Sequence, residues 1–216
     1  MRPRRPSAPA EPADDGPWLD PEEPAPRLLL FATPGLAGLE PALVGGAVAA
    51  VIVDPRALAQ SDVDAATAAC RRHATAWLGR GDAAVAKAAG ADGVHLDDPD
   101  RVAAARTLLG PDRLIGVSCG LSRHAAMVAG EAGADYVMFG ALRDTPEREG
   151  ELADTVAWWS ELFVLPCAAS GRLSATVAHA LVLAGADLVA VQLADADVAG
   201  LADALQPDPS ALATNP

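Results

Sequence analysis

The chain has 216 residues, of which 51% are hydrophobic and 4% aromatic, and its formal net charge is −13. This length and apolar content suffice for one domain with a full core, built largely of small side chains. The acidic balance argues against a nucleic-acid or anionic-membrane partner, because both are bound through clustered lysine and arginine, and no apolar run reaches the 18 or so residues of a membrane span.

The two ends of the chain differ in composition from its middle. Residues 1–26 contain eight prolines among alanine and acidic residues, and such a segment buries too little apolar surface to offset the entropy lost on ordering. We expect a disordered tail over residues 1–26, a single folded domain over 27–206 and a flexible tail over 207–216. The N-terminus carries arginines but no apolar segment after them, unlike a secretory signal, so a cytoplasmic location is expected.

Within the middle of the chain, short apolar runs alternate with helix-period segments. Three runs begin with Gly-Ala-Asp and a fourth is a weaker copy; in each, the glycine can end a helix in the left-handed conformation before a buried strand. The copies start 43 to 52 residues apart, whereas one strand-helix-strand step needs about 30 residues, so a further strand fits between copies. The expected strands are residues 28–32, 74–78, 114–118 and 163–168, together with the apolar ends of the four recurring phrases, residues 46–53, 90–96, 133–140 and 185–191.

Eight strands that alternate with helices predict a parallel (β/α)8 barrel, the TIM-barrel fold. The alternative is an open doubly wound sheet, in which one or two of the weaker runs, above all residues 74–78, would not be strands. Helices are expected over residues 62–73 with Ser61 or Asp62 as the cap, over residues 83–89, before Gly110 and after Ser122.

In this fold the chemistry lies where strands end, so the loops after the strands hold the candidate site residues. The acidic loop of Asp97, Asp98 and Asp100 suits a hard metal such as magnesium carried in with a phosphate, although Asp97 or Asp98 could instead cap the next helix. His95 lies inside the preceding strand, as expected for a packed histidine of the barrel interior rather than for a base.

Later loops offer a phosphate site and a possible lid. Ser170 and Gly171 end the seventh strand, where such barrels bind phosphate through backbone N–H groups, and Arg172 could add a clamp or lie along the helix surface. The charged loop over residues 141–150 could close over the site or be solvated. Cys119 also follows a strand, but no histidine is placed to activate it, and the three cysteines show neither metal-ligand nor disulfide spacing.

Several of these segments resemble one known family. Residues 90–96 (Gly-Ala-Asp-Gly-Val-His-Leu), 114–118 (Leu-Ile-Gly-Val-Ser) and 131–140 (Glu-Ala-Gly-Ala-Asp-Tyr-Val-Met-Phe-Gly), with the Thr145-Pro146 pair, resemble thiamine phosphate synthase and its thiazole tautomerase relatives. The similarity covers about residues 27–195. It implies a barrel that joins a pyrimidine pyrophosphate to a thiazole phosphate, with loss of pyrophosphate and with magnesium bound, so that the expected partners are small phosphorylated molecules.

The resemblance also implies roles for individual residues. Ser118 matches a serine that ends the fifth strand, Thr145 a threonine of the substrate loop, and Arg148 a lysine that contacts the pyrophosphate. Gly171 matches the second glycine of the phosphate-binding pair, and Ser170 precedes it. If the activity is kept, the metal ligands are Asp100 and Asp82, the catalytic residues are Ser118 and Arg148, and the substrate contacts come from Arg56, Thr145, Ser170 and Gly171.

The match is incomplete, which makes the chain a divergent member. Val51, Val53 and Pro55 replace polar side chains after the second strand, and Arg80 and Gly81 replace an Asn-Asp pair whose carboxylate binds metal. Leu193 replaces a serine, and the histidine used by the tautomerase aligns with Gly120. Each lost charged contact can cost about 1.5 to 3 kcal/mol. The chain is therefore expected to be either an active transferase with an altered site, a non-catalytic barrel that binds a phosphorylated ligand, or an enzyme acting on another substrate. Its oligomeric state is not indicated.

Overall fold

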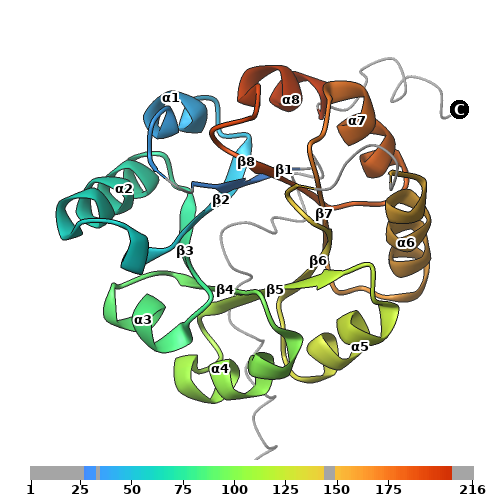
Figure 1. The fold of residues 1–216 in the computed structure, drawn as a ribbon, viewed down its shortest axis with the longest axis horizontal. Helices are drawn as coiled ribbons and strands as arrows, with labels where there is room; N and C mark the ends of the chain where they lie inside the picture. Colours follow the sequence, from blue (N-terminus) through green and yellow to red (C-terminus); the bar gives the residue numbers. More distant parts are fainter. Residues whose placement is uncertain (1–26, 33–34, 144–148, 206–216) are drawn as a thin grey trace, which may run out of the picture.

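The computed structural model describes residues 27–32, 35–143 and 149–205, which form a closed barrel of parallel strands inside a ring of helices (Figure 1). Each strand pairs with its neighbours in the sequence, and the last pairs with the first, which confirms the TIM barrel and excludes the open sheet. The strands are β1 (Arg27–Phe31), β2 (Val48–Val53), β3 (Ala76–Arg80), β4 (Gly93–Leu96), β5 (Leu114–Gly120), β6 (Tyr136–Gly140), β7 (Cys167–Ser170) and β8 (Leu188–Gln192).

The helices cover the outside of the barrel, as Figure 1 shows. Within the described residues, no helix combines the length and apolar character needed to cross a membrane. Both expected tails, residues 1–26 and 207–216, lie outside the described part of the chain. The helices are α1 (Leu39–Leu43), α2 (Gln60–Arg72), α3 (Ala83–Ala88), α4 (Val102–Leu109), α5 (Arg123–Glu131), α6 (Glu149–Leu162), α7 (Ala175–Leu183) and α8 (Val198–Ala204), with short 3-10 turns η1 (Pro55–Ala57) and η2 (Pro99–Arg101).

The third strand lies two residues later than expected, and two further predictions are wrong for identifiable reasons. The apolar run expected as a strand over residues 163–168 becomes a strand only from Cys167, because its first half packs against α6: the Phe163 ring stacks on Trp159 at 4.1 Å, and Trp159 Nε1 donates to the Leu165 carbonyl at 2.7 Å. Helix α2 starts from Ala59 without a side-chain cap, so neither serine nor aspartate of its first turn caps it. The expected cap of α5, Ser122, is confirmed.

The core has two layers, and small side chains fill much of both. Alternate strand residues point outward and pack beneath the helices, while the others fill the barrel interior. Inside the barrel the large rings of Phe31 and Tyr136 lie among alanines of the neighbouring strands, which explains how a chain with few aromatic residues still fills a closed barrel. The interior alanines are Ala49, Ala50, Ala76, Ala168 and Ala190.

The recurring Gly-Ala-Asp phrase has a structural role at the end of the barrel where the strands begin. In each copy the aspartate carboxylate accepts the backbone N–H near the start of the preceding strand: Asp92 from Trp77 at 2.9 Å, Asp135 from Ile115 at 2.7 Å, and Asp187 from Cys167 at 2.9 Å. These bonds tie β4, β6 and β8 to the strands before them. The phrase therefore stabilises the fold, away from the end of the barrel that carries chemistry.

Candidate functional site

The ends of the strands surround a cavity of about 1030 Å³ at the mouth of the barrel, called here the large cavity. One wall is charged and comes from the segments that follow β2, β3 and β4. The adjoining wall, from β5 and β6, is uncharged. The charged wall consists of Asp54, Arg56, Arg80 and Asp97, the uncharged wall of Ser118, Cys119, Gly120, Met138 and Gly140, and the rest of the lining includes Phe31, Leu142, Arg143 and Gln192.

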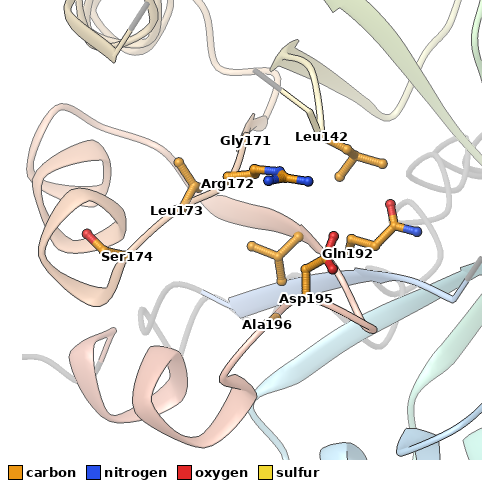
Figure 2. Close-up of a pocket in the computed structure, with 9 residues that line it drawn as sticks. Leu142, Gly171, Arg172, Leu173, Ser174, Gln192, Asp195 and Ala196 are labelled. Atoms are coloured by element: carbon orange, nitrogen blue, oxygen red, sulfur yellow. The ribbon is translucent and has the colours of Figure 1, made fainter. Parts of the chain in front are cut away.

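A second cavity of about 380 Å³, the small cavity, lies between the ends of β7 and β8 and shares Leu142 and Gln192 with the large one. Figure 2 shows the Arg172 side chain extending across it, with Asp195 and Gln192 on the other side. Gly171 lies in its wall, and Ser174 caps the start of α7 there. A guanidinium beside backbone N–H groups and a helix N-terminus suits a phosphate monoester, whereas the Asp195 carboxylate opposes one.

The arginines of the charged wall are already paired with carboxylates. Arg56 Nε and Nη2 reach the two Asp54 oxygens at 3.0 and 3.2 Å, and this contact lowers the pKa of Asp54 and raises that of Arg56. Arg80 Nη2 donates to Asp97 at 3.1 Å. A phosphorylated ligand would therefore compete with these carboxylates for the guanidinium groups. The predicted pyrophosphate contact Arg56 does line the large cavity.

The predicted metal ligands lie on adjacent loops. Asp82 caps α3, where Oδ1 accepts the N–H groups of Ala84 and Val85 at 2.9 and 3.1 Å, and these bonds lower its pKa; its Oδ2 lies 3.7 Å from Arg101. Asp100 is exposed on η2, which Asp98 caps, so the capping alternative is confirmed for Asp98.

This arrangement fits only one kind of metal binding. Among the described residues there is no group of three histidine, cysteine, aspartate or glutamate side chains that could hold an ion by themselves. A magnesium ion that arrives with phosphate oxygens needs only one or two carboxylates. Asp82 and Asp100 are not among the residues that line the two cavities. Magnesium binding stays a prediction.

A hydrogen-bonded chain of three side chains runs from the barrel interior to the large cavity. His95 Nδ1 lies 2.8 Å from the Tyr136 hydroxyl, and His95 Nε2 lies 2.9 Å from Ser118 Oγ. His95 and Tyr136 have no exposed surface, and the Phe31 ring packs edge-on against the imidazole with centroids 5.1 Å apart. Gly116 leaves the room for the tyrosine, since a Cβ there would come within 2.0 Å of the Tyr136 ring.

Burial decides the charge states of His95 and Tyr136. Loss of solvation lowers the pKa of His95 to about 3 and raises that of Tyr136. At neutral pH the imidazole is therefore uncharged and too weak a base to take a proton from Ser118. The expectation of a packed interior histidine is confirmed. The sequence analysis missed the bonds to Ser118 and Tyr136, although all three residues occupy inward-facing positions of adjacent strands, which the alternation of side chains could have shown.

The predicted phosphate residues at the end of β7 are divided between interior and surface. Ser170 is fully buried and its hydroxyl donates to the Phe139 carbonyl at 3.0 Å, within the barrel wall. Gly171 lines the small cavity. The close packing here also requires glycine at the end of β6, because Gly140 has φ +78° and a Cβ there would lie 2.3 Å from the Ser170 carbonyl.

The remaining candidates contribute no reactive group to the described site. Thr145 and Arg148 lie outside the described residues, as does half of the loop proposed as a lid. Cys119 lines the large cavity but is buried, and desolvation raises its pKa to about 12, as it does for Cys70 and Cys167. A thiol with so high a pKa is a poor nucleophile at neutral pH.

Comparison with known proteins then places the chain in a family. A sequence model described as thiamine monophosphate synthase matches residues 31–194, about three quarters of the chain. The chain belongs to the thiamine monophosphate synthase family. This membership confirms the resemblance found in the sequence motifs.

Curated relatives in the family carry the name thiamine-phosphate synthase. Those from Erythrobacter litoralis and Rhodospirillum centenum are 43% and 45% identical over 130 and 111 residues, which is 57% and 50% of this chain. The chain spans only 61% and 54% of the length of these two relatives. The relative from Thiobacillus denitrificans is 39% identical over 163 residues, covering 72% of this chain and 77% of its own length.

Solved structures share the fold. Thiamine phosphate pyrophosphorylase from Pyrococcus furiosus superposes with a TM-score of 0.65 at 24% identity, over 83% of this chain and 93% of that one. Tryptophan synthase from Mycobacterium tuberculosis gives 0.64 at 16% identity, over 85% and 94%. At these identities the likeness shows the barrel architecture alone.

Proposed function

We propose that this family member is a transferase of thiamine biosynthesis that joins a pyrimidine pyrophosphate to a thiazole phosphate with loss of pyrophosphate. The observation that carries this proposal is the pair of joined cavities: the small one suits a phosphate monoester, and the large one has room for a second ring-bearing substrate. The names of the curated relatives support the same reaction. A cytoplasmic location fits such an enzyme.

Each cavity would hold one substrate. The thiazole phosphate would lie in the small cavity, against the backbone of Gly171, the Arg172 guanidinium and the start of α7, with Ser170 supporting that loop from inside. The pyrimidine ring would lie in the large cavity, and Arg56 would face its pyrophosphate. Thr145 and Arg148 would act from the loop after β6, as the family resemblance implies.

Magnesium, if bound, would be held by Asp100 and Asp82 and would supply positive charge beside the pyrophosphate. For Asp82 this requires a shift of Arg101, which now lies 3.7 Å from its free oxygen. The helix cap that Asp82 provides uses the other oxygen and can remain.

A second function is favoured by the charged wall. Because Arg56 and Arg80 are paired with Asp54 and Asp97, a pyrophosphate must displace two carboxylates before it gains bonds to these arginines. A barrel that binds one phosphorylated ligand without catalysis would need the small cavity but no pyrophosphate site in the large cavity.

Calorimetry and an activity assay separate the two functions. The purified full chain is titrated with thiazole phosphate, then with pyrophosphate plus magnesium, and is assayed with both phosphorylated substrates beside the Thiobacillus denitrificans relative. Arg172→Ala should weaken thiazole phosphate binding, whereas Arg71→Ala, a change at an exposed arginine of α2, should not. Product formation supports the transferase. Binding of thiazole phosphate without product supports the binding barrel, and no binding of either ligand contradicts both.

A further inference from the structure

The chain of His95, Tyr136 and Ser118 connects the driest part of the barrel to the mouth. Tyr136 comes from β6, His95 from β4 and Ser118 from β5 between them, so the hydrogen bonds of 2.8 and 2.9 Å join three adjacent strands. Only Ser118 is partly exposed, and it lines the large cavity. The hydroxyl of Ser118 is thus the point at which the buried chain meets a ligand.

The positions of the protons in these three side chains follow from the chemistry of a neutral imidazole. A neutral imidazole has one N–H donor and one lone-pair acceptor, so its two nitrogens must play opposite parts. Burial keeps the proton on Tyr136 and off the second nitrogen of His95. A phenol is a better donor than acceptor, and an unprotonated imidazole nitrogen is a good acceptor. The favoured arrangement therefore has the Tyr136 hydroxyl donating to Nδ1 and Nε2–H donating to Ser118 Oγ.

We propose, resting on the function proposed for this cavity, that Tyr136 acts through His95 as a positioning residue that turns Ser118 into a hydrogen-bond donor for a phosphate oxygen of the ligand. With its oxygen occupied by Nε2–H, the serine directs its own O–H into the large cavity. The opposite tautomer would make Ser118 donate inward and present only lone pairs, which repel an anion.

Packing alone does not account for the hydrogen-bonded side chains of His95, Tyr136 and Ser118. Phenylalanine at position 136 and an apolar side chain at position 95 would fill the same interior without burying three polar groups, and buried polar groups cost free energy unless they are hydrogen-bonded. The buried polar groups are explained if they fix the direction in which Ser118 donates its hydrogen bond.

The tautomer can be measured without any ligand. The full chain has four histidines, so ¹⁵N-histidine labelling gives few signals, and His95→Gln assigns those of His95. We expect the Nε2–H tautomer in the wild-type protein and a shift toward the Nδ1–H tautomer in Tyr136→Phe. An Nδ1–H tautomer in the wild type, or no change in Tyr136→Phe, overturns the inference.

A double-mutant cycle tests the coupling to the ligand, with inorganic pyrophosphate plus magnesium as the calorimetric probe. Loss of a hydrogen bond to a charged group should make Ser118→Ala bind about tenfold to a hundredfold more weakly. Tyr136→Phe should weaken binding in the wild type but add nothing to Ser118→Ala, since it acts only through that hydroxyl. Leu188→Val, a matched loss of bulk in the barrel interior that does not line either cavity, should leave affinity unchanged.

The outcomes separate this inference from the proposed function. Additive losses in the two single variants, or an equal loss in Leu188→Val, show that Tyr136 acts only through stability and overturn the inference. If the wild type binds neither pyrophosphate nor thiazole phosphate, the proposed function fails and the ligand-facing part of the inference fails with it, while the tautomer measurement still shows whether Tyr136 orients His95.

Discussion

The buried histidine should make the fold sensitive to mild acid. The pKa of His95 falls from its ordinary value of 6.5 to about 3 in the folded chain, so the folded state binds no proton at this site at pH 5 while the unfolded state does. The stability that the neutral imidazole contributes is complete above pH 6.5 and is lost as the pH falls toward 3. Each pH unit in this range costs about 1.4 kcal/mol, so at pH 5 the loss amounts to about 2 kcal/mol.

His95→Gln removes the titrating group while an amide can still make hydrogen bonds. Urea unfolding followed by the fluorescence of the buried Trp159 gives the free energy of unfolding of both proteins from pH 5 to pH 8. The wild type should lose about 2 kcal/mol more than the variant between pH 7.5 and pH 5, because every other titrating group is common to both. Parallel pH profiles for the two proteins would refute the reasoning, since they would show that His95 titrates alike in the folded and unfolded states.

Three further predictions concern the two ends of the barrel and its interior. Asp187→Ala should lower the free energy of unfolding by about 1 to 3 kcal/mol in urea melts because it leaves the buried Cys167 N–H unpaired, and Asp187→Asn, which keeps an acceptor, should cost less. Asp195→Asn should tighten thiazole phosphate binding by about twofold to fivefold in calorimetry, since it removes a like charge from the small cavity; unchanged affinity would place the phosphate elsewhere. Gly116→Ala should lower the thermal midpoint by several degrees, because its Cβ meets the Tyr136 ring.

The fold could be predicted because its signal is repeated along the chain. Buried strands and the glycines before them recur in three close copies, and the aspartates at positions 92, 135 and 187 each bind the strand before their own. A repeated local interaction leaves a repeated motif. The errors occurred where apolar residues served another element, as Phe163 does when it stacks on α6, because periodicity alone does not tell which neighbour an apolar residue packs against.

The site was predicted less completely because its geometry depends on contacts between distant loops. Arg56, Ser118 and Gly171, which were expected in the site from their positions at strand ends, line the cavities, and their roles stay predictions. The pairing of Arg80 with Asp97, 17 residues later, has no local motif, and neither has the chain from Tyr136 through His95. Such contacts depend on the register between strands, which follows from the closed barrel and not from any one segment.

The charged wall permits the binding of pyrophosphate but disfavours the binding of magnesium. Its ion pairs are exposed and contribute little, so a diphosphate that offers bidentate bonds to Arg56 and Arg80 can displace their carboxylates at small cost. Arg80 cannot replace the carboxylate that the family resemblance places after β3, because magnesium requires oxygen ligands and a guanidinium repels it. Asp82 can supply that ligand only after Arg101 moves away from its free oxygen. Pyrophosphate affinity in calorimetry should therefore fall by less than about tenfold when EDTA replaces magnesium. A complete loss of binding in EDTA would show that Asp100 and Asp82 still hold the ion and that the arginines do not compensate for it.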